Sequence, residues 1–148
     1  MEKQGSFSDI EYGGKKKTTR KEKFLQMMEA MIPWKKWVDI IERHYPKGGH
    51  GRPPMGAEKM LRMYLLQIWF NLSDEGMEDA LYDIQPMRQF VGINLMTEAV
   101  PDATTLLKFR HMLEKNGIAK KLFDELKGEL TRSGKMMKEG TIVDATIF

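Results

Sequence analysis

The sequence predicts a mainly α-helical protein whose last residues change to a β-strand. From about residue 19 to residue 133, apolar residues recur every three or four positions, between residues that typically begin and end helices. From Thr141 to Phe148 the pattern changes to a short run rich in β-branched residues, which is typical of a strand and could pair with residues 135–138. Because a lone strand or hairpin is only marginally stable in water, we expect residues 134–148 to begin a second domain.

The first 18 residues predict a flexible basic arm, because Gly, Ser and Lys dominate them. Thr19 and Glu22 then have the spacing of a capping box, which predicts that a helix begins there. Pro33 interrupts this helix and suits the first turn of the next one. Six cations stand between residues 15 and 23 against the single acid Glu22: Lys15, Lys16, Lys17, Arg20, Lys21 and Lys23.

The middle of the chain predicts a loop followed by the central helix of the core. Residues 46–56 contain three prolines and four glycines, which predicts a loop. The helix expected over about 57–71 has a broad apolar face, so we expect it to lie in the core. Ser73 is a suitable N-cap for a short acidic helix over about 74–83.

Three further helices are expected before the change of pattern. Pro86 begins a short one that ends at Gly92. Asp102 is a suitable N-cap for a helix that runs to about Lys115, and the next helix covers about 118–132. The helical domain is therefore expected to span residues 19–133.

The composition excludes several classes of site. The chain has no cysteine, which excludes disulfide scaffolds, cysteine-ligated zinc and thiol catalysis. His44, His50 and His111 lack the paired spacing of metal ligands. With 24 Lys and Arg against 21 Asp and Glu, the net charge of +3 says little by itself. The absence of a signal peptide and of a long apolar run predicts a cytoplasmic protein without a membrane partner.

Several blocks of sequence together carry a family likeness and cover essentially the whole chain: Ser6–Asp9, Pro33-Trp34, His44–Lys47 with Gly51–Pro53, Leu72–Tyr82, Val100–His111 and Gly140–Thr146. In this order they resemble the N-terminal part of bacterial insertion-sequence transposases of the DDE type, specifically the insertion-sequence-five group. The resemblance implies a multi-helix DNA-binding domain followed by the first strand of an RNase H-like α/β domain.

The resemblance also implies a metal-dependent nuclease centre. Three carboxylates of such enzymes hold two Mg²⁺ or Mn²⁺ ions across the scissile phosphate. Asp144 matches the first carboxylate and is the expected catalytic and metal-binding residue. The second Asp and the Glu would follow Phe148, so the expectation is a truncated transposase that binds no metal tightly and is inactive alone.

The helical domain would then bind double-stranded DNA at the terminal inverted repeats of the element. The basic arm suits phosphates or a minor groove, and Arg52 is either a phosphate contact or a solubilising loop residue. The acidic helix and the helix over 102–115 are the best helix-turn-helix candidate, with the acidic side chains facing away from DNA or towards a basic partner. Five residues of the second helix are expected to face DNA: Thr104, Thr105, Lys108, Arg110 and His111.

Three functions of different class remain open. The chain is an enzyme fragment completed by a downstream reading frame, a non-catalytic DNA-binding regulator of transposition, or a decayed remnant. A homo-oligomer or a downstream catalytic polypeptide is the expected protein partner. The nucleotide sequence that follows codon 148 separates the first function from the others. Specific affinity for the terminal repeats separates the second from the third.

We predict that the 148-residue polypeptide alone does not nick DNA, because one carboxylate cannot hold two metal ions about 4 Å apart. Supercoiled plasmid incubated with the protein and Mg²⁺ or Mn²⁺ should stay supercoiled. Nicking that disappears in Asp144→Ala would contradict the prediction.

Overall fold

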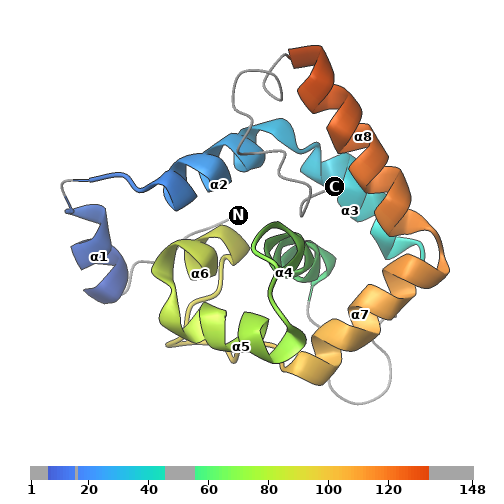
Figure 1. The fold of residues 1–148 in the computed structure, drawn as a ribbon. Helices are drawn as coiled ribbons and strands as arrows, with labels where there is room; N and C mark the ends of the chain where they lie inside the picture. Colours follow the sequence, from blue (N-terminus) through green and yellow to red (C-terminus); the bar gives the residue numbers. More distant parts are fainter. Residues whose placement is uncertain (1–6, 16, 46–55, 134–148) are drawn as a thin grey trace.

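The computed structural model describes residues 7–15, 17–45 and 56–133, and within these ranges the only regular elements are eight α-helices (Figure 1). They are α1 (Phe7–Gly13), α2 (Arg20–Met31), α3 (Trp34–Glu42), α4 (Ala57–Trp69), α5 (Asp74–Asp83), α6 (Gln85–Val91), α7 (Ala103–Lys115) and α8 (Ile118–Ser133). The predicted strand over 141–148 and most of the predicted loop over 46–56 lie outside the described residues. No described helix combines the length and apolarity needed to cross a bilayer.

Helix α4 is the centre of the fold, as the sequence predicts. Ten of its 13 residues are buried, and the helix packs against α3, α5, α6 and α7. Figure 1 shows α4 nearly end-on, with the other helices around it. Aromatic rings from neighbouring helices close the core edge-on: Phe109 lies 6.4 Å from Tyr64 and Phe90 lies 5.9 Å from Trp69, between ring centroids.

The predicted helix ends are largely confirmed. Thr19 and Glu22 form both hydrogen bonds of the capping box at the start of α2. The Ser73 hydroxyl accepts from the Gly76 N–H at 2.9 Å, and Asp102 caps α7 through the Thr105 N–H at 2.8 Å. Gly92 ends α6 with φ of 86°, a left-handed conformation that favours glycine. Pro33 is the N-cap of α3 rather than a residue of its first turn.

Phe7–Gly13 are helical, within the segment 1–18 for which the sequence predicts a flexible basic arm. These residues form α1, which packs against α6, and the Gly14 N–H closes the helix on the carbonyls of Ile10 and Glu11. The Gly- and Lys-rich composition of the whole segment hid a short stretch that tertiary contact stabilises as a helix.

Arg62 connects four helices from a buried position on α4. Its side chain is 4% exposed, and its guanidinium donates to both carboxylate oxygens of Glu29 on α2 at 2.8 and 2.9 Å. It also donates to Glu58 at 3.1 Å and to the carbonyl of Phe90 on α6 at 2.9 Å. The ring of Trp34 on α3 lies 3.9 Å from the guanidinium carbon, so the cation stacks on an aromatic face. The burial of this cation therefore requires that α2, α3, α4 and α6 meet.

We predict that Arg62→Met lowers the free energy of unfolding by about 2 kcal/mol, because it leaves the buried Phe90 carbonyl without its donor, removes two ion pairs and removes the stacking on Trp34. Equilibrium urea unfolding, followed by circular dichroism, measures the loss. The control is Lys35→Met: this side chain is 91% exposed, and we expect a change within about 0.5 kcal/mol. Equal stability of Arg62→Met and the wild type would show that the network does not hold the helices together.

Candidate nucleic-acid interface

The cations predicted for the basic arm divide into paired and exposed groups. Lys15 pairs with Glu22 at 2.7 Å and lies over the ring of Tyr12, and Lys21 lies over the ring of Phe70. Three of the cations are exposed and have no ion pair within the described part of the chain: Lys17, Arg20 and Lys23. Lys16 lies outside the described residues. The start of α2 therefore offers fewer cations to a phosphate backbone than the sequence suggests.

Glu22 ties the segment before α2 to that helix. Its carboxylate accepts from the Lys15 ammonium and from the Thr19 N–H, the latter at 2.9 Å. The hydrogen bond from Lys15, followed by the one from Thr19, holds the pKa of Glu22 below its usual range. Lys15 is thus committed to an internal contact.

Helix α7 has one buried face and one exposed face. Leu106, Phe109 and Leu113 are buried against the core. Four of the five residues predicted to face DNA are exposed: Thr104, Thr105, Lys108 and His111. Because Thr104, Lys108 and His111 follow at intervals of four and three residues, they form one line along the helix. This line of hydroxyl, ammonium and imidazole groups can contact phosphates and base edges.

The fifth residue, Arg110, is mostly buried and forms an ion pair within the protein. Its guanidinium pairs with Asp74 of α5 at 2.5 Å, and the two side chains are only 24% and 16% exposed. The amide of Gln67 donates to the same Asp74 oxygen at 2.7 Å. Burial raises the pKa of Asp74, but the hydrogen bonds from Arg110 and Gln67 outweigh it and leave the pKa below its ordinary value. Arg110 therefore joins α5 to α7, and in this structure it is not a free DNA contact.

The acidic helix α5 faces the start of α7. Glu78 accepts from the Ala103 N–H at 2.9 Å, beside the Asp102 cap. Two carboxylates therefore occupy the N-terminus of α7, where a phosphate would otherwise find backbone donors. Only the exposed side of α7, and not its N-terminus, is therefore open to an anionic ligand.

The two predicted DNA-binding regions do not come together. Figure 1 shows the start of α2 and helix α7 on opposite sides of α4. Arg52 and Asp144 lie outside the described residues, so their positions relative to α7 are not part of the described fold. Among the described residues, no group of three His, Asp or Glu side chains is placed to hold a metal ion.

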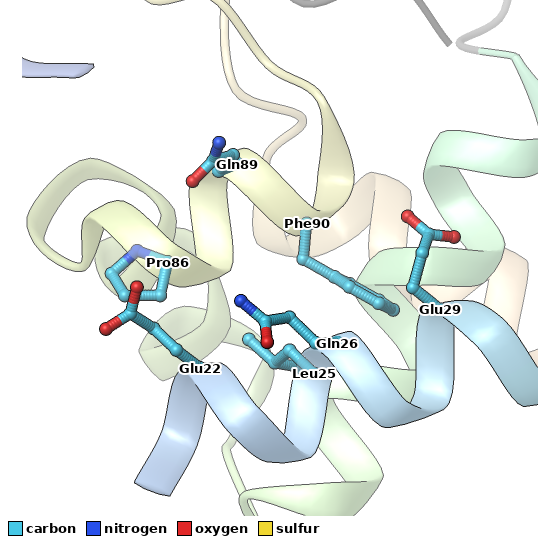
Figure 2. Close-up of a pocket in the computed structure, with 7 residues that line it drawn as sticks. All are labelled: Glu22, Leu25, Gln26, Glu29, Pro86, Gln89 and Phe90. Carbon is cyan, nitrogen blue, oxygen red and sulfur yellow. The ribbon is translucent and has the colours of Figure 1, made fainter. Parts of the chain in front are cut away.

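A hollow between α2 and α6 lacks the charge that a phosphate site needs. Figure 2 shows Gln26 lying between the two helices, and the hollow is lined by Glu22, Leu25, Gln26, Glu29, Pro86, Gln89 and Phe90. Its two carboxylates are already paired, Glu22 with Lys15 and Glu29 with Arg62. No cation lines it, so it does not suit a nucleic-acid backbone.

A basic groove lies between α3 and α8, and it was not predicted from the sequence. It is lined by Lys35, Lys36, Asp39, Ile40, Arg43 and Lys121. The signal in the sequence was the pair Lys35-Lys36 with Arg43 seven residues after Lys36, which places Lys36 and Arg43 on one side of a helix.

We predict that Arg110→Gln raises the pKa of Asp74. Burial raises this pKa, and the substitution removes the hydrogen bond from Arg110, which is one of the two that lower it. Side-chain NMR of Asp74 across a pH series measures it. The variant should also lose about 2 kcal/mol of stability at pH 7. Because pairing depresses the folded-state pKa, this loss should be full above the ordinary value of 3.8 and should fade as the pH falls below it. Lys108→Gln is the control on the same helix, and an unchanged Asp74 titration in Arg110→Gln would contradict the assignment.

The chain matches a known protein family. Residues 14–112 match the family described as "Transposase domain (DUF772)", which is about two thirds of the chain. The matched range covers α2 to α6 and most of α7, including Thr104, Thr105 and Lys108, but neither α8 nor Asp144. No solved structure matches the chain.

Proposed function

Because the chain belongs to the transposase domain family DUF772, we propose that it is the DNA-binding part of a DDE transposase of the insertion-sequence-five group. The observation that carries this proposal is the family match over residues 14–112. A role in transposition follows from the family. The finer assignment to the insertion-sequence-five group rests on the order of the sequence blocks from Ser6–Asp9 to Gly140–Thr146.

The proposed ligand is double-stranded DNA at the terminal inverted repeats of the element. The exposed side of α7 supplies the direct contacts: the Lys108 ammonium to a phosphate, and the hydroxyls of Thr104 and Thr105 to phosphates or base edges. His111 continues the same line and can donate or accept at a base edge. Short hydroxyl side chains allow the helix backbone to approach the groove closely.

The exposed cations at the start of α2 supply a separate contact. Lys17, Arg20 and Lys23 stand at the start of α2. The start of α2 lies on the other side of α4 from α7 (Figure 1), so these cations would bind a different stretch of the DNA backbone. Cations that contact only phosphates add affinity without adding sequence preference. This division assigns sequence reading to α7 and general attraction to the start of α2.

For the nuclease centre, we propose that Asp144 is the first metal-binding carboxylate. The proposal rests on the resemblance of the block Gly140–Thr146. Mg²⁺ or Mn²⁺ bound there would stabilise charge on the scissile phosphate. Asp144 would contribute one oxygen ligand to that ion, which suits a hard divalent cation.

We predict that the protein binds terminal inverted-repeat DNA at least about a thousandfold more tightly than a random duplex at physiological salt. Fluorescence anisotropy with both duplexes over a salt series measures the ratio. Thr104→Ala combined with Thr105→Ala should reduce the ratio, because it removes two hydroxyls from the side that reads bases. Thr131→Ala, which removes a hydroxyl at an exposed position of α8, is the control.

The same titration separates the alternatives. A regulator of transposition keeps the large ratio, whereas a decayed remnant retains only weak, salt-sensitive binding that is equal for both duplexes. Complete absence of binding to either duplex at low salt would refute the proposed function.

A further inference from the structure

Cations from two helices line the groove between α3 and α8. Figure 1 shows α3 and α8 side by side, and the two helices are in contact. Four of the six residues that line the groove are cations, one is the acid Asp39, and one is the apolar Ile40. Protein interfaces have an apolar core, which this groove lacks. The excess of cations in the groove suits a ligand with many negative charges.

Two of the four cations are available to a ligand. Arg43 and Lys121 are exposed and make no ion pair with any described residue. Lys35 pairs with Asp39 at 3.4 Å, but the lysine side chain is 91% exposed, so this pair is weak and exchangeable. Lys36 pairs with Glu125. The groove keeps a net positive charge when Asp39 and Glu125 are both included.

The pair between Lys36 and Glu125 fixes the relative position of the two helices. The other oxygen of Glu125 accepts from the indole N–H of Trp37 at 3.1 Å, and Trp37 is fully buried. One carboxylate on α8 therefore binds two successive residues of α3. The hydrogen bond from Lys36 and the one from Trp37 help to hold the pKa of Glu125 below its usual range, so the carboxylate stays charged at neutral pH.

The spacing on α3 matches an extended ligand rather than a small anion. Arg43 is the C-cap of α3 in a helical conformation, seven residues after Lys36. At about 1.5 Å per residue, these two cations are separated by about 10 Å along the helix axis. Lys121 faces them from α8 across the groove. The repeated phosphates of a nucleic-acid strand can contact a row of cations of this length along its whole extent.

We propose that the groove between α3 and α8 binds the phosphate backbone of double-stranded DNA, with Arg43 and Lys121 as its principal contacts. This inference rests on the proposed function and adds to it a third contact surface, part of which lies outside the residues that match the family. The contact is independent of base sequence, because the groove offers ammonium and guanidinium groups without a helix face directed at base edges.

The test measures the salt dependence of binding with the full chain. Labelled terminal-repeat and random duplexes are titrated at salt concentrations between about 50 and 200 mM. Arg43→Gln and Lys121→Gln should each lower the slope of log affinity against log salt by about one, equally for both duplexes. The ratio between the duplexes should stay at the wild-type value. Arg43→Lys should keep the wild-type slope, and Lys127→Gln, an exposed lysine of α8 outside the groove, should also keep it.

The outcomes separate this inference from the proposed function. If the wild type binds and both glutamine variants keep its slope, the groove proposal is wrong and the proposed function stands. If the wild type binds no DNA, both are wrong. A changed ratio between duplexes at an unchanged slope would show that the groove reads bases and would overturn the phosphate assignment. Tighter binding of poly-glutamate than of duplex DNA at equal charge would assign the groove to an acidic protein instead.

Discussion

The need to satisfy one buried guanidinium constrains the whole arrangement of helices. Arg62 has five N–H donors, and its side chain can be buried only because Glu29, Glu58 and the Phe90 carbonyl accept hydrogen bonds from it. These acceptors belong to α2, α4 and α6, while Trp34 on α3 covers the flat face of the cation. A different packing of these helices would leave a charge buried without partners, which costs several kcal/mol. The position of α3 is thereby set, and with it the position of α8 through Glu125.

Pairing with acids of the chain itself also determines which cations remain free to bind a ligand. Lys15, Lys36, Lys59, Arg62 and Arg110 all pair with acids of the chain itself. The net charge of +3 therefore does not describe how charge is distributed over the surface, because each internal pair neutralises one cation and one acid. Exposed cations without such a pair remain at the start of α2, along α7 and in the groove between α3 and α8. Charge is concentrated locally even though the chain is almost neutral overall.

The helix ends could be predicted because their determinants are local. Thr19, Ser73 and Asp102 each bond to a backbone N–H three residues later, which a sequence pattern records directly. The partners of Arg62 and Arg110 could not be predicted, because Glu29 is 33 residues from the first and Asp74 is 36 residues from the second. Arg110 stands among residues that do face solvent on α7, so the sequence alone assigned it to DNA. Helix α1 was missed because it is too short to show a period.

The separation of surfaces implies a separation of tasks in any complex with DNA. Helix α7 ends at Lys115 and α8 begins at Ile118, so α7 and the groove are joined by a two-residue connection and by direct packing. The start of α2 lies on the opposite side of α4 (Figure 1). Side chains that contact only phosphates position a protein on the duplex, and those that reach base edges select the sequence. Among the described helices, α7 combines hydroxyl and imidazole groups with a cation in one exposed line, so the proposed function assigns selection of the site to α7. The other two surfaces would then determine how firmly and in which orientation the duplex is held.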